Sequence, residues 1–191
     1  MHIVKLGGSL YHTAELKSWL TLLEQTALNE CVVIVPGGGP FADMVRQAQQ
    51  LHQFDDQHAH HMAILAMAQY GLILQALLPS AVLVKTPAEV SSHCQLSIWL
   101  PDDQLLQVEE ITQNWQITSD SLALWFTQQF PQSSLSLIKR VSADSGDLNV
   151  LSKKGIIDQG FTALFQQRPI LTQLIHYQTL ENFPEHGIKL G

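Results

Sequence analysis

The sequence predicts an α/β protein, a three-layer αβα sandwich around a mainly parallel sheet. Short apolar runs alternate with longer segments of helical periodicity, and the runs at His2–Leu6 and Cys31–Val35 are the clearest. The second run is largely β-branched and uninterrupted, which is typical of a strand covered on both faces. Strands that alternate with helices form parallel sheets through right-handed crossovers. A glycine cluster follows each of these strands, at the sheet edge where ligands bind.

The N-terminal half alternates strands and helices without interruption. Apolar residues at helical spacing, such as Leu16, Leu20 and Leu23, predict a helix over Ala14–Leu28 with Thr13 as its N-cap. Glycines and prolines at 36–40 end the second strand, and Pro79 ends a long apolar helix. The other elements expected here are helices to about Gln50 and over about Gln57–Leu78, and strands over Ala81–Lys85 and Gln95–Leu100.

The C-terminal half is less regular. Thr118-Ser-Asp-Ser121 has the composition of a helix start, which predicts a helix to about Gln129, and the polar stretch Ser142–Lys154 indicates a loop. The remaining expected elements are strands over Leu135–Lys139 and Pro169–Tyr177, a short helix over Gln159–Gln167 and a last edge strand over His186–Gly191. No repeat or linker is visible, so one domain over residues 1–191 is expected.

Composition excludes several classes of protein. The chain has 191 residues, of which 46% are hydrophobic and 14% charged, as in a folded domain. Ten Lys and Arg against seventeen Asp and Glu give a net charge of −7, so no nucleic-acid partner is expected. No apolar run or N-terminal pattern predicts a membrane span or a signal peptide. Two cysteines, Cys31 and Cys94, form no disulfide framework, so reduced thiols and a cytoplasmic location are expected.

The two glycine clusters carry the first indication of function. In Lys5-Leu-Gly-Gly-Ser9 and Pro36-Gly-Gly-Gly-Pro40, the absence of Cβ atoms lets backbone N–H groups approach phosphate oxygens before a helix N-terminus. Lys5 would add a mobile positive charge. Two facing loops would hold a donor and an acceptor phosphate across one cleft. Neither loop matches the Walker or dinucleotide patterns. The alternative is that each is a tight strand-to-helix turn.

The loops, together with Thr118-Ser-Asp120, resemble the amino acid kinase superfamily, and the resemblance extends from Ile3 to about Phe161. The stretches His60–Gln69 and Trp115–Ala123 are most similar to its (aminomethyl)furanmethanol-phosphate kinase branch, which serves methanofuran biosynthesis. The resemblance implies transfer of the γ-phosphoryl group of ATP to a small, phosphorylated acceptor. ATP and Mg are the implied cofactors, with Mg held through the ATP phosphates and not by a protein metal site.

The resemblance also implies roles for individual residues. Lys5 would bind the transferring phosphoryl group, and Asp120 would organise the catalytic lysines. Residues implied to bind the nucleotide phosphates are Gly7, Gly8, Ser9, Ser119, Lys139 and Asp144, and those implied to hold the acceptor are Gly37, Gly38 and Gly39. An acceptor-binding half would cover about 1–115, and a trimmed nucleotide-binding half about 116–191. The sequence departs from many relatives after Val141, where Asp144 and Gly146 are displaced.

Other functions remain open at this stage. The chain could be a kinase for another small phosphate, carboxylate or carbamate. From a different class, the chain could be a nucleotide-binding or storage protein without turnover. The altered loop after Lys139 and the short length favour this alternative, whereas the presence of Lys5, Gly8 and Asp120 argues against it. Thr118-Ser-Asp-Ser121 taken alone could be a helix cap. No local motif supports a Ser or Cys nucleophile with a catalytic His partner, so a hydrolase is rejected.

Two further patterns lie in or near the helix over Gln57–Leu78. His58 and His61 share a helical face and could bind zinc. The alternatives are that they pack against a neighbouring helix or contact the acceptor. The helix is apolar on more than one face, which predicts a homodimer, with a fully buried helix as the alternative. Its apolar residues are Met62, Ile64, Leu65, Met67, Ala68, Leu72, Ile73 and Leu74. Trp99, Trp115, Trp125 and Phe126 are expected in the core.

Overall fold

The computed structural model describes residues 1–92 and 95–191, and this part of the chain forms a seven-stranded sheet in the order β3-β4-β2-β1-β5-β6-β7. The strands are β1 (His2–Leu6), β2 (Val32–Pro36), β3 (Val82–Val84), β4 (Leu96–Trp99), β5 (Ser134–Lys139), β6 (Thr172–His176) and β7 (Ile188–Lys189). Strands β1 to β6 pair in parallel, and β7 pairs antiparallel with β6. The predicted fold class is confirmed.

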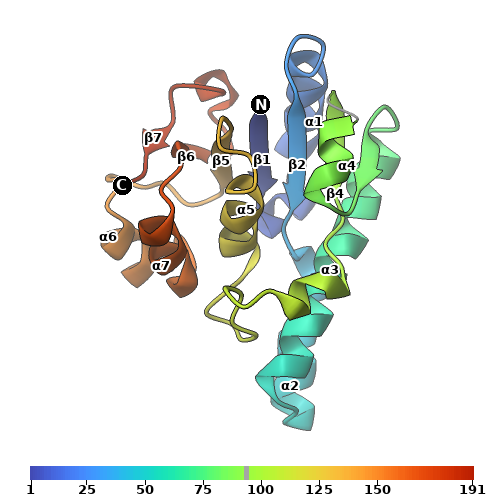
Figure 1. Ribbon diagram of the computed structural model, residues 1–191, viewed down its shortest axis with the longest axis vertical. Coiled ribbons are helices and arrows are strands. Elements are labelled where there is room, and N and C mark those ends of the chain that lie inside the picture. Colours follow the sequence, from blue (N-terminus) through green and yellow to red (C-terminus); the bar gives the residue numbers. More distant parts are fainter. Residues whose placement is uncertain (93–94) are drawn as a thin grey trace.

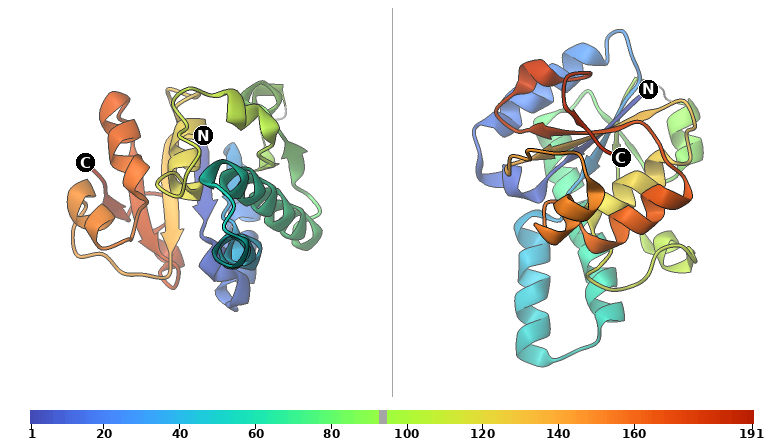
Figure 2. Two further views of the ribbon diagram at one scale, coloured as in Figure 1. Left: turned by 90° about the horizontal axis from the view of Figure 1, so that it is seen from below. Right: turned by 90° about the vertical axis from the view of Figure 1, so that its left-hand side faces the viewer.

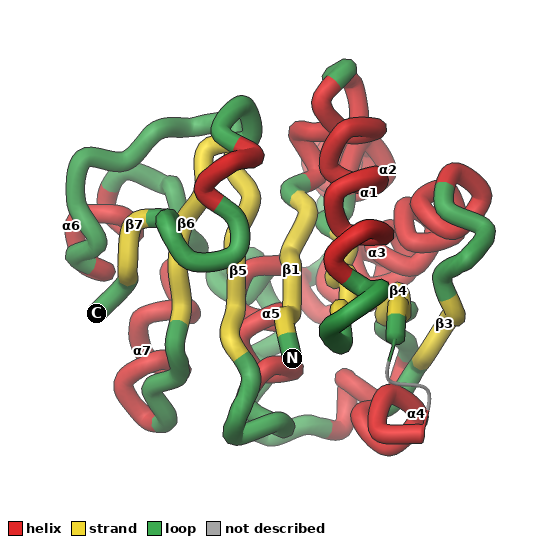
Figure 3. Tube along the Cα trace, turned by 90° about the horizontal axis from the view of Figure 1, so that it is seen from above, coloured by secondary structure: helices red, strands yellow, loops and turns green. Residues whose placement is uncertain are grey.

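Helices cover both faces of the sheet, with α1 on one side and α5 and α7 on the other (Figure 3). The α-helices are α1 (Glu15–Thr26), α2 (Gly39–His52), α3 (Asp56–Leu77), α4 (Pro87–Ser92), α5 (Ser119–Thr127), α6 (Leu148–Lys153) and α7 (Gln159–Gln167). Short 3-10 helices occupy η1 (Gly8–His12), η2 (Asp103–Gln107) and η3 (Leu180–Asn182). The chain therefore forms the three layers expected from its alternating pattern.

The side-chain alternation of β1 divides the core between these two faces. Val4 packs in the cluster that contains Trp19 of α1, whereas Ile3 packs in the cluster that contains Leu122 of α5. Because successive side chains of a strand point to opposite faces, Lys5 lies on the same face as Ile3. The same alternation in β5 places Lys139 on that face. Both lysines therefore point toward α5.

Helices α2 and α3 form a hairpin that extends beyond the carboxyl edge of the sheet (Figures 1 and 2). Ile64 and Met67 of α3 pack into the core on the α5 side, and Leu74 packs into the core on the α1 side. Other apolar residues of this helix face outward: Leu65 is 43% and Leu72 is 50% exposed. The alternative of a fully buried helix is therefore wrong.

Several expected elements differ in detail from those observed. The stretch expected as a loop at 142–154 contains α6, whose N-cap Asp147 accepts hydrogen bonds from the N–H groups of Asn149 and Val150 at 2.8 and 3.0 Å. Thr13 does not cap α1; its hydroxyl donates to the carbonyl of Leu10 at 3.0 Å, at the end of η1. Helices of five or six residues are too short to show a periodic pattern, so η1, η2, α4 and α6 escaped prediction.

The structure also bears on two expectations drawn from composition, the absence of a membrane span and the reduced state of the thiols. In residues 1–92 and 95–191, no helix combines the length and the hydropathy that a membrane span requires. The expectation of reduced thiols is wrong for Cys31, which is disulfide-bonded. Cys94 lies outside the described residues.

Candidate active site

Three charged side chains from three elements meet beneath the glycine loops. The Lys5 ammonium of β1 lies 2.7 Å from Asp120 Oδ1, and the Lys139 ammonium of β5 lies 2.5 Å from Asp120 Oδ2. Asp120 is in the first turn of α5. The side chains of Lys5 and Asp120 are each 5% exposed, and that of Lys139 is 15% exposed. This Lys5–Asp120–Lys139 network joins two residues expected to be catalytic with one expected to bind the nucleotide.

The ionisation of the network follows from its burial and its geometry. Burial alone would raise the pKa of Asp120, but the ammonium groups of Lys139 and Lys5 more than offset it and bring that pKa to about 2. Burial lowers the pKa of Lys5, although the charge of Asp120 opposes this effect. Asp120 is therefore an ionised anchor for two ammonium groups at neutral pH. The interpretation of Asp120 as a helix cap is not what the structure shows, because both carboxylate oxygens face lysines.

Two neighbouring cavities lie at this site, and the network lines the second of them. The first, of about 430 Å³, is lined by Gly8, Ser9, Gly38, Gly39 and Ser119 among others. The second, of about 550 Å³, is lined by Lys5, Asp120, Lys139 and residues of the α6–α7 region. Arg46, Trp115 and Thr118 line both cavities, so they form a shared wall. A site of this shape has room for two ligands side by side.

The two glycine loops touch through their backbones. A Cβ atom on Gly8 would lie 2.4 Å from the nitrogen of Gly39, and one on Gly37 would lie 2.4 Å from the nitrogen of Gly8. Gly39 also has φ of +55°, which favours glycine. The N–H groups of Gly7 and Gly37 donate to backbone carbonyls of Ile138 and Leu6 at 3.2 and 2.9 Å. Of the loop residues expected in the site, Gly8, Ser9, Gly38 and Gly39 reach the first cavity.

Two helix N-termini point at the first cavity. Gly39 begins α2 and Ser119 begins α5, and both residues line this cavity. The first-turn N–H groups of a helix have no partner within the helix, and the helix dipole adds partial positive charge there. The cavity is therefore suited to bind an anionic group such as a phosphate.

The contact between the glycine loops gives a stability prediction. Gly8→Ala is expected to lower the free energy of unfolding by about 2 kcal/mol, because the new methyl group must displace backbone in a packed turn. Gly155→Ala is the control, since Gly155 has φ of +66° but a Cβ there meets nothing within 4 Å. Its expected cost is left-handed strain alone, about 1 kcal/mol. Urea denaturation measures both, and equal losses in the two variants would contradict the packing argument.

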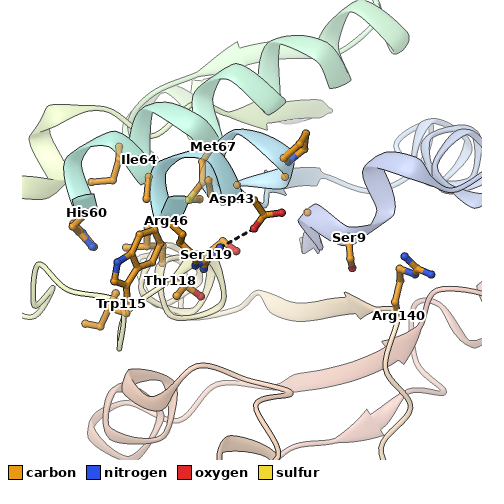
Figure 4. A pocket seen from close by; sticks show the side chains of 18 of the residues that line it. Ser9, Asp43, Arg46, His60, Ile64, Met67, Trp115, Thr118, Ser119 and Arg140 are labelled. Carbon is orange, nitrogen blue, oxygen red and sulfur yellow. Dashed lines mark hydrogen bonds and ion pairs between the residues drawn. The ribbon is translucent and has the colours of Figure 1, made fainter. Parts of the chain in front are cut away.

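The shared wall contains residues that the sequence did not single out. The guanidinium carbon of Arg46 lies 4.3 Å from the ring centroid of Trp115, and Asp43 holds the same guanidinium at 3.0 Å. Trp115 Nε1 donates to Gln49 Oε1 at 2.6 Å. Figure 4 shows Arg46 and Trp115 at one end of the cavity, with Arg140 and Ser9 at the other. The expectation that Trp115 is a core residue is wrong, because it is half-buried and lines both cavities.

A second buried carboxylate, Asp158, also escaped the sequence prediction. Its Oδ2 accepts from the N–H and hydroxyl of Thr118, both at 2.8 Å, and from the N–H of Ser121 at 3.0 Å. Its Oδ1 accepts from the hydroxyl of Ser121 and from the N–H of Phe161. Burial raises the pKa of Asp158, and the nearby charge of Asp120 adds to this. An aspartate before a helical pattern indicates the cap of α7 but not a contact 37 to 40 residues away.

The other predicted residues lie in different places. Asp144 is exposed, and its carboxylate is 3.8 Å from the Lys154 ammonium, so the structure does not bring it to either cavity. His58 pairs with Asp55 at 2.6 Å and His61 pairs with Asp103 at 2.9 Å. Within the described ranges, no three His, Cys, Asp or Glu side chains gather as metal ligands. The two histidines therefore bind separate carboxylates.

Known proteins are similar to this chain in sequence and in fold. The chain is 35% identical over 130 residues to [5-(aminomethyl)furan-3-yl]methyl phosphate kinase of Methanocaldococcus jannaschii, a match that covers 65% of this chain and 59% of that relative. Uridylate kinase from Archaeoglobus fulgidus superposes with a TM-score of 0.78 at 15% identity, over 100% of this chain and 99% of that one. UMP kinase from Ureaplasma parvum superposes with a TM-score of 0.70 at 14% identity, over 99% and 96% of the two chains.

These solved structures share the fold. The family model described as "Amino acid kinase family" matches residues 1–143, which include both glycine loops, Lys5, Asp120 and Lys139. The resemblance stated from the sequence is thereby confirmed, and the relative from M. jannaschii supports the branch that was named. The chain belongs to the amino acid kinase family.

Proposed function

We propose that the protein is an ATP-dependent kinase that transfers the γ-phosphoryl group to a small phosphorylated acceptor. The observation that carries this proposal is the Lys5–Asp120–Lys139 network, which lines the second of two neighbouring cavities, together with two touching glycine loops that line the first. The first candidate for the acceptor is [5-(aminomethyl)furan-3-yl]methyl phosphate, after the name of the relative from M. jannaschii. The reaction would then belong to the biosynthesis of a methanofuran-type cofactor.

The two halves of the chain would divide the substrates between them. The acceptor would contact residues of about 1–115, including Gly37, Gly38 and Gly39. The nucleotide would lie against residues of about 116–191 and the first glycine loop, with its phosphates near Gly8, Ser9, Ser119 and Lys139. Mg-ATP supplies the phosphoryl group, with the metal held by the phosphates.

The residues of the network would act through position and charge. The Lys5 ammonium is fixed by Asp120 at 2.7 Å, so its positive charge is in place before negative charge develops on the transferring group. Asp120 cannot serve as a base, because its pKa is about 2 and both its oxygens face ammonium groups. A phosphate acceptor is already an anion at neutral pH and needs no base. Direct in-line transfer suits this arrangement.

The charges that line the first cavity support an anionic acceptor. Arg46 and Arg140 contribute two guanidinium groups, of which that of Arg46 is paired with Asp43 in the same cavity, and the N-termini of α2 and α5 contribute partial positive charge. A planar guanidinium binds phosphate oxygens through paired hydrogen bonds.

A direct assay tests the proposal. Wild-type protein with Mg-ATP and the phosphorylated furan amine should release ADP and form a diphosphate ester, detected by coupled assay and by ³¹P NMR. The unphosphorylated alcohol, UMP, and carboxylate and carbamate compounds serve as competing acceptors in the same screen. ADP formation only with one of those would replace the acceptor, and ATP binding without transfer to any of them would favour the storage alternative.

The exposed face of α3 would hold a second copy of the chain. Leu65 and Leu72 are two turns apart on this helix and leave apolar surface in solvent. Light scattering at micromolar concentration should give the mass of a dimer for wild type and of a monomer for Leu72→Glu. Leu28→Glu is the matched control, because Leu28 is 81% exposed and lies beyond α1, and it should stay dimeric. A monomeric wild type would exclude the dimer.

Two expectations stay predictions from the sequence. The net charge of −7 argues against a nucleic-acid partner. A cytoplasmic location has no support from Cys31, which is disulfide-bonded.

A further inference from the structure

Asp158 uses the whole hydrogen-bonding capacity of its carboxylate at the junction of α5 and α7. It accepts five hydrogen bonds, from Thr118, Ser121 and Phe161. A carboxylate offers about four lone-pair sites, so Asp158 has none to spare for a metal ion or a substrate proton. It lines the second cavity but acts on the protein and not on a ligand.

The donors of these hydrogen bonds lie on both sides of Asp120. Thr118 is the N-cap residue of α5, yet its hydroxyl makes no capping bond and turns to Asp158 instead. Ser121 follows Asp120 directly and donates both its N–H and its hydroxyl. The same carboxylate caps α7 through the N–H of Phe161 at 3.0 Å. One side chain therefore serves the N-termini of two helices, α5 and α7.

We propose that Asp158 is a positioning residue for the reaction, because it clamps the start of α5 to the start of α7 and so fixes where Asp120 holds Lys5 and Lys139. The inference rests on the proposed function only in assuming that this network carries the transfer. Asp120 is in the first turn of α5, so a shift of that turn would displace the carboxylate that holds both ammonium groups. A displacement of about 1 Å in a reacting site costs up to about a hundredfold in rate.

The charge of Asp158 also affects the pKa of Lys5 in the network. Three charged groups act on the Lys5 ammonium: Asp120 of α5 and Asp158 before α7 raise its pKa, and Lys139 of β5 lowers it. A neutral residue of the same shape at position 158 would therefore lower the pKa of Lys5. Ser121→Ala would remove one hydrogen bond and leave this charge in place. The two variants separate the electrostatic effect from the geometric one.

The experiment uses Asp158→Asn and Ser121→Ala in the full chain, with Asp147→Asn as the matched control. Asp147 caps α6 through two N–H groups, is exposed and lines neither cavity. Steady-state kinetics with Mg-ATP and the phosphorylated furan amine give kcat and KM. NMR of protein labelled with ¹³C at lysine Cε gives the pKa of Lys5, whose signal is assigned by its absence from Lys5→Ala.

Asp158→Asn should lose about ten- to a hundredfold in kcat, with a smaller change in the acceptor KM. Its Lys5 should titrate at lower pH, and the basic limb of the pH–rate profile should move in the same direction. Ser121→Ala should lose kcat severalfold with Lys5 titrating as in wild type, and Asp147→Asn should match wild type in both measurements.

A folded Asp158→Asn protein with unchanged kcat and unchanged Lys5 titration would overturn the proposal. If that variant does not fold, an unchanged kcat in Ser121→Ala would do the same. If wild type does not turn over the acceptor, the proposed function fails, but the titration of Lys5 still tests the clamp.

Discussion

Lys5→Ala is expected to lose about a hundredfold to a thousandfold in turnover while it keeps most of its nucleotide affinity, by analogy with removal of one preorganised donor to a developing oxyanion. The Lys5 ammonium is buried and anchored at 2.7 Å from Asp120, so its charge is in place before transfer begins. A group that acts mainly on the transition state lowers kcat far more than it weakens substrate binding. Steady-state kinetics and nucleotide titration measure the two effects separately.

The controls for Lys5 follow from its surroundings. Asp120 keeps its contact with Lys139 at 2.5 Å in this variant, so the fold should persist, which circular dichroism can check. Lys5→Arg should not restore turnover, because a planar guanidinium does not fit where a compact ammonium is held under a glycine loop. Lys17→Ala, at an exposed position of α1, should behave as wild type. Near-normal turnover of a folded Lys5→Ala protein would remove the proposed mechanism.

Asp120→Asn should lower the free energy of unfolding by about 3–5 kcal/mol, the range for breaking a buried ion pair by removing one partner. Asparagine would leave the ammonium groups of Lys5 and Lys139 facing each other without the carboxylate between them. Urea denaturation at neutral pH measures the loss. Asp103→Asn is the control, because Asp103 forms an exposed pair with His61 and such pairs contribute about 0–1 kcal/mol. Similar losses in the two variants would contradict the buried network.

The destabilisation caused by Asp120→Asn is expected to depend on pH. The pKa of Asp120 is about 2 in the folded protein against an ordinary value of 3.8, so its ionised form favours the folded state. This contribution is fully present above the unfolded pKa and is lost as the pH falls toward the folded pKa. The difference in unfolding free energy between wild type and Asp120→Asn should therefore shrink from about pH 5 to about pH 2. A difference that stays constant over this range would rule out the low pKa.

The sequence predicts the part of the site that is formed by residues at the carboxyl ends of strands. Lys5 is the penultimate residue of β1 and Lys139 is the last residue of β5, and Gly8 and Gly38 follow the ends of parallel strands, so the topology alone brings them to one edge. The clamp at Asp158 could not be predicted in this way, because its partners lie 37 to 40 residues earlier and neither local pattern refers to the other. From the sequence, Asp158 can be recognised only as the N-cap of α7, because its contacts with Thr118 and Ser121 depend on tertiary packing.

The residues of the shared wall were missed for a related reason. Arg46 lies two turns into α2, where an arginine on a helix usually faces solvent. Its stacking depends on Trp115, 69 residues later in the chain. Trp115 was placed in the core because large aromatic residues are usually buried. Its half-exposed position follows from the cavities on either side of it, which no local pattern encodes.

Under the proposed function, the hairpin of α2 and α3 would separate substrate choice from phosphoryl-transfer chemistry. Arg46, His60 and Met67 line the first cavity from this hairpin, which extends beyond the sheet, whereas Lys5 and Lys139 belong to the central strands. Replacing side chains on the hairpin would then alter the shape and charge offered to an acceptor without changing the buried ions of the sheet. The protein would serve as a scaffold in which new acceptor specificities are engineered one helix at a time, while the Lys5–Asp120–Lys139 network is left intact.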